Sequence, residues 1–292
     1  MLIYQSSLDS GILNCYYQIM GQRVSALLSY AILGNDTFEM AHTHRDKLIS
    51  LILDSGSWTD QRSPFPTDID EYIEYLGRAA KYFDFYINLD QDFSEDVFSG
   101  VNLANLLKME KKGLKPVPVI HSLYAGEIEY YLDRDYPIVA LGSSYATRLD
   151  ALKFVFEKFE KKPDVKIHIF GTTNYDNLIE IPAYSVDSSS WGTQGKYGKI
   201  AYWNPESEET DKTEYIYVRG YYHLDKPPKH HFVAYWCKRQ LEEYLEKTFN
   251  FTYHDLLLEK TGYCNIQIVN MHHYVELEKR ITAEHRKRGF IS

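Results

Sequence analysis

Short apolar runs alternate with amphipathic segments along most of the chain. Runs with the composition of β-strands occupy residues 48–56, 83–90, 114–122, 136–144, 165–173 and 183–190. Further strands are expected upstream, within 23–33 and within either 2–6 or 14–19. Between the runs, apolar residues recur at helical spacing in the segments 67–80, 102–112 and 146–161. Such an alternation indicates repeated strand–helix units.

The repeat predicts about eight parallel strands, which favours a closed (β/α)8 barrel of the TIM type over an open doubly wound sheet. No Gly-x-Gly-x-x-Gly motif follows any of these strands, so a dinucleotide-binding fold loses its best support. After about residue 192 we expect a glycine-punctuated basic loop, a polar surface loop (204–214) and long helices (232–249 and 269–288). The prediction is a single domain over residues 1–292, with the barrel in about 1–200 and closing and flanking helices in about 230–290.

Almost every predicted strand ends in a polar or small residue. These strand-end residues include Asp54, Ser55, Asp90, His121, Gly142, Ser143, Gly171 and Asp187. In a barrel the carboxyl ends of all strands meet at one face, where the active sites of this fold lie. We therefore expect these side chains to converge on one pocket.

Composition narrows the class of protein. The formal net charge of -9 argues against binding nucleic acid over the whole surface, but it leaves local patches open, such as Lys196 with Lys199. No apolar run approaches the ~18 residues that a membrane span needs, and the first residues lack the features of a signal peptide. We therefore expect a cytoplasmic protein with no membrane partner. The three cysteines are far apart and fit neither a disulfide framework nor a Cys-x-x-Cys metal motif.

Asp54, Asp90 and Asp187 are the chemically informative members of the strand-end set. Two carboxylates beside an anomeric carbon can act as nucleophile and as general acid/base, with a covalent sugar ester as intermediate. A third carboxylate suits a base that offers N–H donors, as guanine does at N1 and N2. Strand-end acids can equally hold Mg²⁺ or cap helices, so the residues alone leave these alternatives open.

Several segments resemble those of the tRNA-guanine transglycosylase superfamily, in the same order along the chain. They are LDSGSW (53–58), NLD (88–90), LGSS (141–144), FGTTNYDNLIEIPAYSVDSSSW (170–191), the following GTQGKYGK, and IVNMHHYVELEKRITAEHRKRGF (268–290). Each is weak by itself, and their order and spacing carry the resemblance. It spans the chain from about residue 48 to the end.

The resemblance implies base exchange, in which guanine leaves C1′ of a nucleoside and a 7-deazaguanine replaces it. Asp187 would be the nucleophile and Asp54 the general acid/base, while Asp90 would read the N1/N2 edge of the base. Ser55, His121, Gly142 and Ser143 would complete the base pocket, with His121 at a place where the family often has glutamine. Trp58 or Tyr145 is a candidate for stacking on the base.

The chain departs from the family at its zinc site. Val269 stands where the family has a histidine ligand, and the closely spaced cysteines are absent from 215–236. We therefore predict no structural zinc and no other cofactor, with apolar packing around Trp236, Leu241 and Tyr244 in its place.

The compact chain resembles the DNA-guanine transglycosylases, particularly those of bacteriophages, more than the tRNA-modifying members. That resemblance implies DNA and a free preQ0-like base as partners, within the host cytoplasm if a phage encodes the chain. Lys196 and Lys199 would then hold phosphates that flank a flipped-out nucleotide. tRNA modification, nucleoside or glycoside hydrolysis, and a non-catalytic partner subunit stay as alternatives. Monomer and homodimer are both open.

Overall fold

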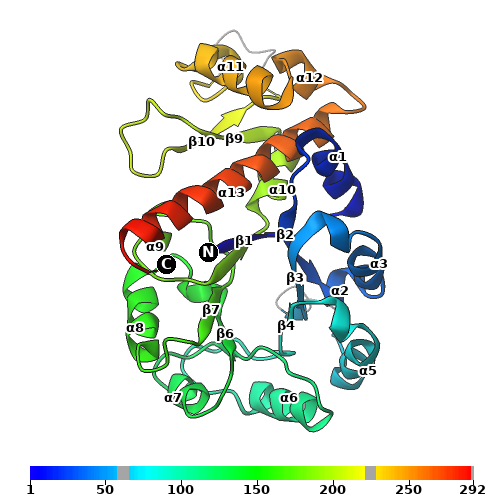
Figure 1. Ribbon diagram of the computed structural model, residues 1–292, viewed down its shortest axis with the longest axis vertical. Coiled ribbons are helices and arrows are strands. Elements are labelled where there is room, and N and C mark those ends of the chain that lie inside the picture. The colour runs from blue at the N-terminus through cyan, green and yellow to red at the C-terminus, as the bar shows by residue number, and fades with distance from the viewer. Residues whose placement is uncertain (58–65, 221–227, 291–292) are drawn as a thin grey trace.

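The computed structural model describes residues 1–57, 66–220 and 228–290. Within them, eight strands pair in parallel in one sheet: β1 (Leu2–Ser6), β2 (Val24–Ser29), β3 (Leu48–Asp54), β4 (Phe85–Tyr86), β5 (Val119–Ile120), β6 (Ile138–Leu141), β7 (Lys166–Ile169) and β8 (Ser185–Ser188). Their spatial order is β4-β3-β2-β1-β8-β7-β6-β5. The Val117 backbone joins the two outer strands, accepting a hydrogen bond from Asn88 N–H (3.0 Å) and donating one to the Tyr86 carbonyl (2.8 Å). The sheet therefore curls into the TIM-type (β/α)8 barrel that the sequence predicts (Figure 1).

Helices surround the strands on the outside of the barrel (Figure 1). They are α1 (Ser10–Met20), α2 (Tyr30–Leu33), α3 (Asp36–Thr43), α5 (Ile69–Ala79), α6 (Gly100–Lys111), α7 (Glu127–Leu132), α8 (Leu149–Phe159) and α9 (Tyr175–Leu178). In α5, the Asp68 side chain caps the helix by accepting hydrogen bonds from the backbone N–H groups of Asp70 and Glu71. Such a cap stabilises a helix by about 1 kcal/mol.

The hydrophobic core has two parts, as a closed barrel requires. The smaller part fills the barrel interior and consists of Tyr4, Leu27, Ile52, Ile87, Val117, Val119, Ile138 and Ala140. The larger part lies between the outer faces of the strands and the surrounding helices. Since successive residues of a strand point to opposite faces, each strand supplies both parts, and its inward residues near the carboxyl end reach the mouth of the barrel.

The remainder of the chain lies against one side of the barrel (Figure 1). It comprises α10 (Ser190–Lys196), β9 (Lys199–Trp203), β10 (Thr213–Tyr217), α11 (Lys238–Phe249), α12 (Tyr253–Leu257) and α13 (Gly262–Lys287). Helix α13 packs along β1, where the Glu278 carboxylate accepts a 2.7 Å hydrogen bond from Ile3 N–H. The side-chain amide of Asn270 donates to the carbonyls of Trp191 and Lys199, both at 3.0 Å, and so joins α13 to α10 and β9.

The structure decides between the two predicted positions of the first strand and corrects the prediction for the segment after residue 192. The first strand is Leu2–Ser6, and residues 14–19 belong to α1. The expected basic loop after residue 192 is instead helix α10 followed by strand β9. A Cβ on Gly195 would lie 2.7 Å from the Gln267 side chain, so glycine at this position permits the close packing of α10 on α13. Tertiary packing has therefore overridden the low helix propensity of glycine.

Candidate active site

The predicted pocket residues lie together at the carboxyl ends of the strands. A cavity of about 350 Å³ is lined by residues that include all seven predicted for catalysis or base binding: Asp54, Ser55, Asp90, His121, Gly142, Ser143 and Asp187. This volume is near the lower end of the ~300–1,000 Å³ that is usual for ligand pockets, so the cavity suits a small ligand. The expectation that strand ends far apart in sequence converge is confirmed.

Asp187 is held by donors from both neighbouring strands. The Ser6 hydroxyl, at the end of β1, donates to Oδ2, and the backbone N–H of Gly171, just beyond β7, donates to Oδ1 at 2.9 Å. The Asp187 residue is 7% exposed. Gly171 has a φ of +71°, a conformation that glycine adopts at little cost and that belongs to the turn presenting its N–H. The carboxylate therefore has a fixed orientation at the cavity wall.

Asp54 ends β3 and has an unusual protonation equilibrium. Burial, and after it the charge of Asp187, raises its pKa to about 7. The backbone N–H groups of Gly56 and Ser55 oppose this shift, and the charge of Asp90 adds to it. Near neutral pH the carboxyl is therefore present both as acid and as base, which is the property that proton transfer in both directions requires.

Asp90 follows β4 and pairs with His121. The Asn88 side-chain amide donates to Asp90 Oδ1 at 2.7 Å, and His121 Nε2 lies 3.2 Å from Asp90 Oδ2. Burial alone would lower the pKa of His121, but the Asp90 carboxylate, with the charge of Glu127, raises it above its ordinary value. The pair places a carboxylate acceptor beside an imidazole donor on one wall of the cavity.

Buried groups behind the cavity fix the position of His121. The Glu127 carboxylate accepts hydrogen bonds from the backbone N–H groups of His121 and Ser122, both at 2.7 Å. Burial raises the pKa of Glu127. Tyr145 donates to the His121 carbonyl at 2.7 Å and is buried, so it supports the site from behind rather than offering a stacking surface. A Cβ at position 142 would lie 3.1 Å from His121 Nδ1, which explains why Gly142 occupies this strand end.

The remaining sequence predictions fall elsewhere. Lys196 is an exposed residue at the end of α10, and the ammonium of Lys199 lies over the Tyr217 ring, 4.5 Å from its centroid. Neither lysine is among the described residues that line the cavity. Trp58 lies outside the described residues.

Sequence reasoning missed several residues at this cavity. Ser6, Ser29, Phe93, Phe170 and Ser189 contribute to its walls. Ser6 and Ser29 end the first and second strands, so the strand-end rule would have found them had the bounds of these strands been known. Phe93 contacts His121 edge to face, with 5.0 Å between ring centroids, and lies in the long segment after β4.

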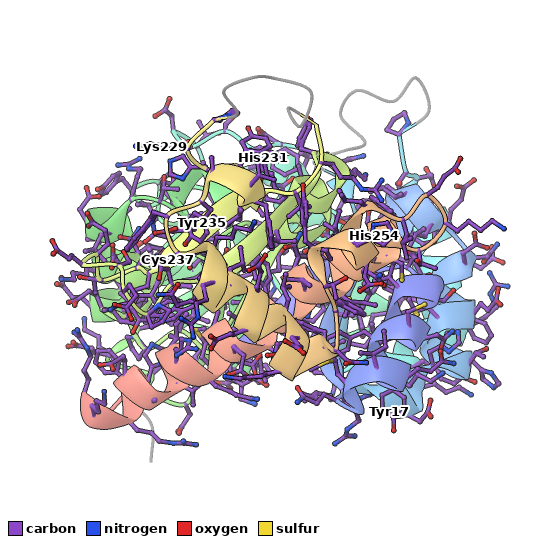
Figure 2. The ribbon with its side chains drawn as sticks, turned by 90° about the horizontal axis from the view of Figure 1, so that it is seen from above. Tyr17, Lys229, His231, Tyr235, Cys237 and His254 are labelled. Carbon is purple, nitrogen blue, oxygen red and sulfur yellow. The ribbon has the colours of Figure 1, made fainter. Side chains whose placement is uncertain are left out.

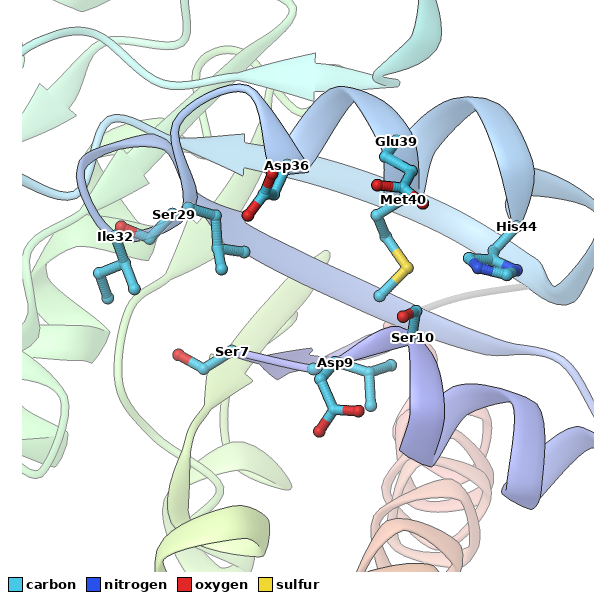
Figure 3. A pocket seen from close by; sticks show the side chains of 11 residues that line it. Ser7, Asp9, Ser10, Ser29, Ile32, Asp36, Glu39, Met40 and His44 are labelled. Carbon is cyan, nitrogen blue, oxygen red and sulfur yellow. The ribbon is translucent and has the colours of Figure 1, made fainter.

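A second cavity, of about 330 Å³, adjoins the first, and Ser7, Ser29 and Ile32 line both. Figure 3 shows Asp36 and Glu39 extending from α3 on one side of this cavity and Asp9, at the start of α1, on the other. Three carboxylates make this side of the mouth unfavourable for phosphate groups.

The C-terminal part of the chain contains His272 and His273 on α13 and a buried cysteine, Cys237. His272 Nδ1 is 3.2 Å from the Tyr16 hydroxyl, and burial lowers the pKa of His273 to about 3. Cys237 is buried at the start of α11 (Figure 2). Among the described residues, no group of three or more His, Cys, Asp or Glu side chains is arranged to hold a metal ion.

Apolar packing in this region includes Leu241 and Tyr244, as predicted, with Leu241 fully buried and Tyr244 packed against the core. The prediction for Trp236 is wrong, because this residue is 66% exposed.

Comparison with known proteins leaves the chain unassigned. No protein-family model matches it, and no curated protein is significantly similar to it. In the part of the chain that the structure describes, no helix has the length and hydrophobicity to cross a lipid bilayer. The resemblance to transglycosylases therefore stays a prediction.

Proposed function

We propose that this protein is a base-exchange transglycosylase that replaces guanine in a nucleic acid, DNA before tRNA, with a preQ0-like 7-deazaguanine. The observation that carries the proposal is the meeting of Asp54, Asp90 and Asp187 in one base-sized cavity, with the pKa of Asp54 at about 7. A carboxylate held by fixed donors, a carboxyl that titrates near neutrality and a third carboxylate paired with histidine provide three separate functions.

The first half of the exchange releases guanine. An oxygen of Asp187 attacks C1′ of the target nucleotide, and the C1′–N9 bond breaks with its electron pair passing to the base. Protonated Asp54 gives its proton to the departing guanine, which leaves as the neutral base. The product is an ester between Asp187 and the sugar.

The second half reverses these events with a different base. The incoming 7-deazaguanine gives its N9 proton to ionised Asp54, N9 attacks C1′, and the ester bond to Asp187 breaks. Both carboxyl groups return to their initial states. Asp54 can serve as acid in the first half and as base in the second because its pKa lies near neutral pH.

Asp90 and His121 would recognise the base. A carboxylate oxygen has more than one lone pair, so Asp90 can accept from guanine N1 and N2 while keeping its contacts to Asn88 and His121. The raised pKa of His121 favours the imidazolium form, which has two N–H donors. One of them can donate a hydrogen bond to the O6 carbonyl of guanine. Adenine offers the opposite pattern of donors and acceptors at this edge and would be rejected.

DNA is proposed as the polymer from the resemblance to the DNA-modifying members. A nucleotide in duplex DNA must leave the base stack to reach a cavity at the bottom of a barrel mouth. The acidic second cavity directs the flanking phosphates away from α3, toward other parts of the rim.

The test is incubation of the purified protein with radiolabelled guanine and, separately, double-stranded DNA, single-stranded DNA or unmodified tRNA. Asp187→Ala removes the nucleophile, and Asp92→Asn is the matched control, a carboxyl on the same rim that is not among the described lining residues. We expect label to enter DNA with the wild type and with Asp92→Asn but not with Asp187→Ala.

The other outcomes separate the alternatives. Label entering tRNA alone would change the polymer and keep the chemistry. Free guanine released from the polymer without incorporation of label would identify a hydrolase. Neither incorporation nor release with any polymer would overturn the proposal and favour a non-catalytic barrel.

A further inference from the structure

We infer that His168 is a positioning residue for Asp187, acting from inside the barrel beneath the cavity. The inference rests on the proposed function and adds a residue to it. His168 lies on β7 and is fully buried. It is not among the described residues that line the cavity, so it reaches the reaction only through Asp187.

The contacts of the imidazole define its orientation. The Ser185 hydroxyl and His168 Nδ1 form a 2.9 Å hydrogen bond between paired positions of β8 and β7. The rings of Tyr4 and Phe170 meet the imidazole edge to face, with centroids 5.9 Å and 4.7 Å away. These contacts leave the ring one orientation, in which Nε2 points toward the carboxyl end of β8.

Nε2 faces Asp187 Oδ1 at 3.6 Å and has no hydrogen-bond partner among the described residues. Fully buried polar atoms without a partner are rare in native proteins, and each calls for an explanation. When the Ser185 hydroxyl donates to Nδ1, Nε2 carries the ring proton and presents it to the carboxylate. A small rotation of Asp187 closes the remaining gap to a hydrogen bond.

This contact would hold Asp187 in place during the proposed reaction. Oδ2 is held by the Ser6 hydroxyl on the cavity side, while Oδ1 is held by Gly171 N–H and faces His168. Oδ2 attacks C1′ with a lone pair that the Ser6 hydroxyl does not use. His168 and Gly171 then keep Oδ1 against the barrel wall, so that the attacking oxygen stays aligned with the sugar.

The kinetic test compares three variants in the guanine-exchange assay. His168→Phe keeps a flat ring and removes both nitrogens, and His168→Gln restores an N–H donor. Tyr4→Phe is the matched control, since it removes a buried hydroxyl that is bonded to Ser50 from the same interior layer. We expect His168→Phe to lower kcat roughly 10- to 100-fold with little change in KM for the polymer. His168→Gln should recover part of that loss, and Tyr4→Phe should exchange guanine like the wild type.

A second measurement is independent of turnover. Imidazole nitrogen NMR of the wild type and of Asp187→Asn reports whether His168 Nε2 senses the carboxylate, with the resonance assigned by its loss in His168→Phe. We expect the Nε2 signal to move in Asp187→Asn and the Nδ1 signal to move in Ser185→Ala.

Full turnover by a folded His168→Phe would overturn the inference and leave the proposed function intact. If the wild type exchanges no base, the proposed function fails. The NMR result then shows by itself whether His168 Nε2 contacts Asp187. An Nε2 signal that is unchanged in Asp187→Asn would then overturn the inference too.

Discussion

Replacing Asp54 by asparagine should stabilise the protein, and by more at pH 8 than at pH 5. The pKa of Asp54 is about 7 in the folded protein, against an ordinary value of 3.8 for a free aspartate side chain. At any pH between 3.8 and about 7, Asp54 is mostly protonated in the folded chain and mostly ionised in the unfolded chain. The free energy of unfolding therefore falls as pH rises through this window, and the penalty is complete above about pH 7.

The size of the effect follows from the shift. One pKa unit corresponds to about 1.4 kcal/mol, so the raised pKa of Asp54 costs up to about 4 kcal/mol at pH 8 and less than half of that at pH 5. The Asp54 side chain is half-buried rather than fully buried, which reduces these values. We expect the stability gained by Asp54→Asn to grow by roughly 2 kcal/mol between the two pH values.

Urea unfolding of the wild type and the variant at both pH values measures this difference. Taking the change with pH cancels whatever asparagine itself alters in packing or hydrogen bonding. Asp92→Asn is the control, because the Ser94 hydroxyl, by hydrogen bonding, lowers the pKa of Asp92. This variant should lose stability, and by the same amount at pH 5 and pH 8. A gain for Asp54→Asn that is equal at pH 5 and pH 8 would refute the reasoning, since it would mean that the carboxyl ionises at its ordinary pH in the folded protein.

Further predictions follow from the same contacts. Asp187→Asn should lower the pKa of Asp54 while leaving it above 3.8, because burial is the larger cause of the shift; carboxyl ¹³C NMR measures this, and an unchanged pKa would contradict the coupling. Glu127→Ala leaves the backbone N–H groups of His121 and Ser122 without an acceptor and should lower the free energy of unfolding by about 2–4 kcal/mol. Glu127→Gln should lose less. Urea unfolding measures the loss, and a value below about 0.5 kcal/mol for Glu127→Ala would contradict this role. Gly56→Ala should lower the free energy of unfolding by more than about 2 kcal/mol, because φ is +81° and the new Cβ would lie 2.2 Å from Ser29 Oγ. Gly21→Ala, where φ is also positive but no atom lies near the new Cβ, should lose about 1 kcal/mol. Equal losses for the two variants would show that the contact with Ser29 is relieved.

The sequence predicted the membership of the cavity better than the bounds of the elements that supply it. Strands β4 and β5 contain two residues each, although much longer runs were expected around them. Asp90 and His121 nevertheless reach the cavity. In a closed parallel barrel every strand delivers its carboxyl end to the same face, so an error of a few residues in a boundary leaves the destination unchanged.

Predictions failed where packing between distant segments decides the local conformation. The segment after Trp191 is rich in glycine and predicts a loop, but Gly195 is helical because α13 lies close against it. Trp236 was expected in the core and is exposed, while Val269 on α13 is buried. No local pattern reveals which face of a long C-terminal helix the barrel will cover.

His168 could not be predicted from the rule that site residues lie at strand ends. It lies in the middle of an apolar strand, where a histidine is expected to be a packed residue with no reactive neighbour. The order of strands follows from the strand–helix repeat, so β7 and β8 are predictable neighbours, but the register between them is not. A shift of one residue would turn the imidazole to the outer face of the barrel and away from Asp187. The observed pairing of His168 with Ser185, two residues before Asp187, sets the side chains of all three on the inner face. The register of a single strand pair thus decides whether this histidine belongs to the site, and that information appears only when the barrel is closed.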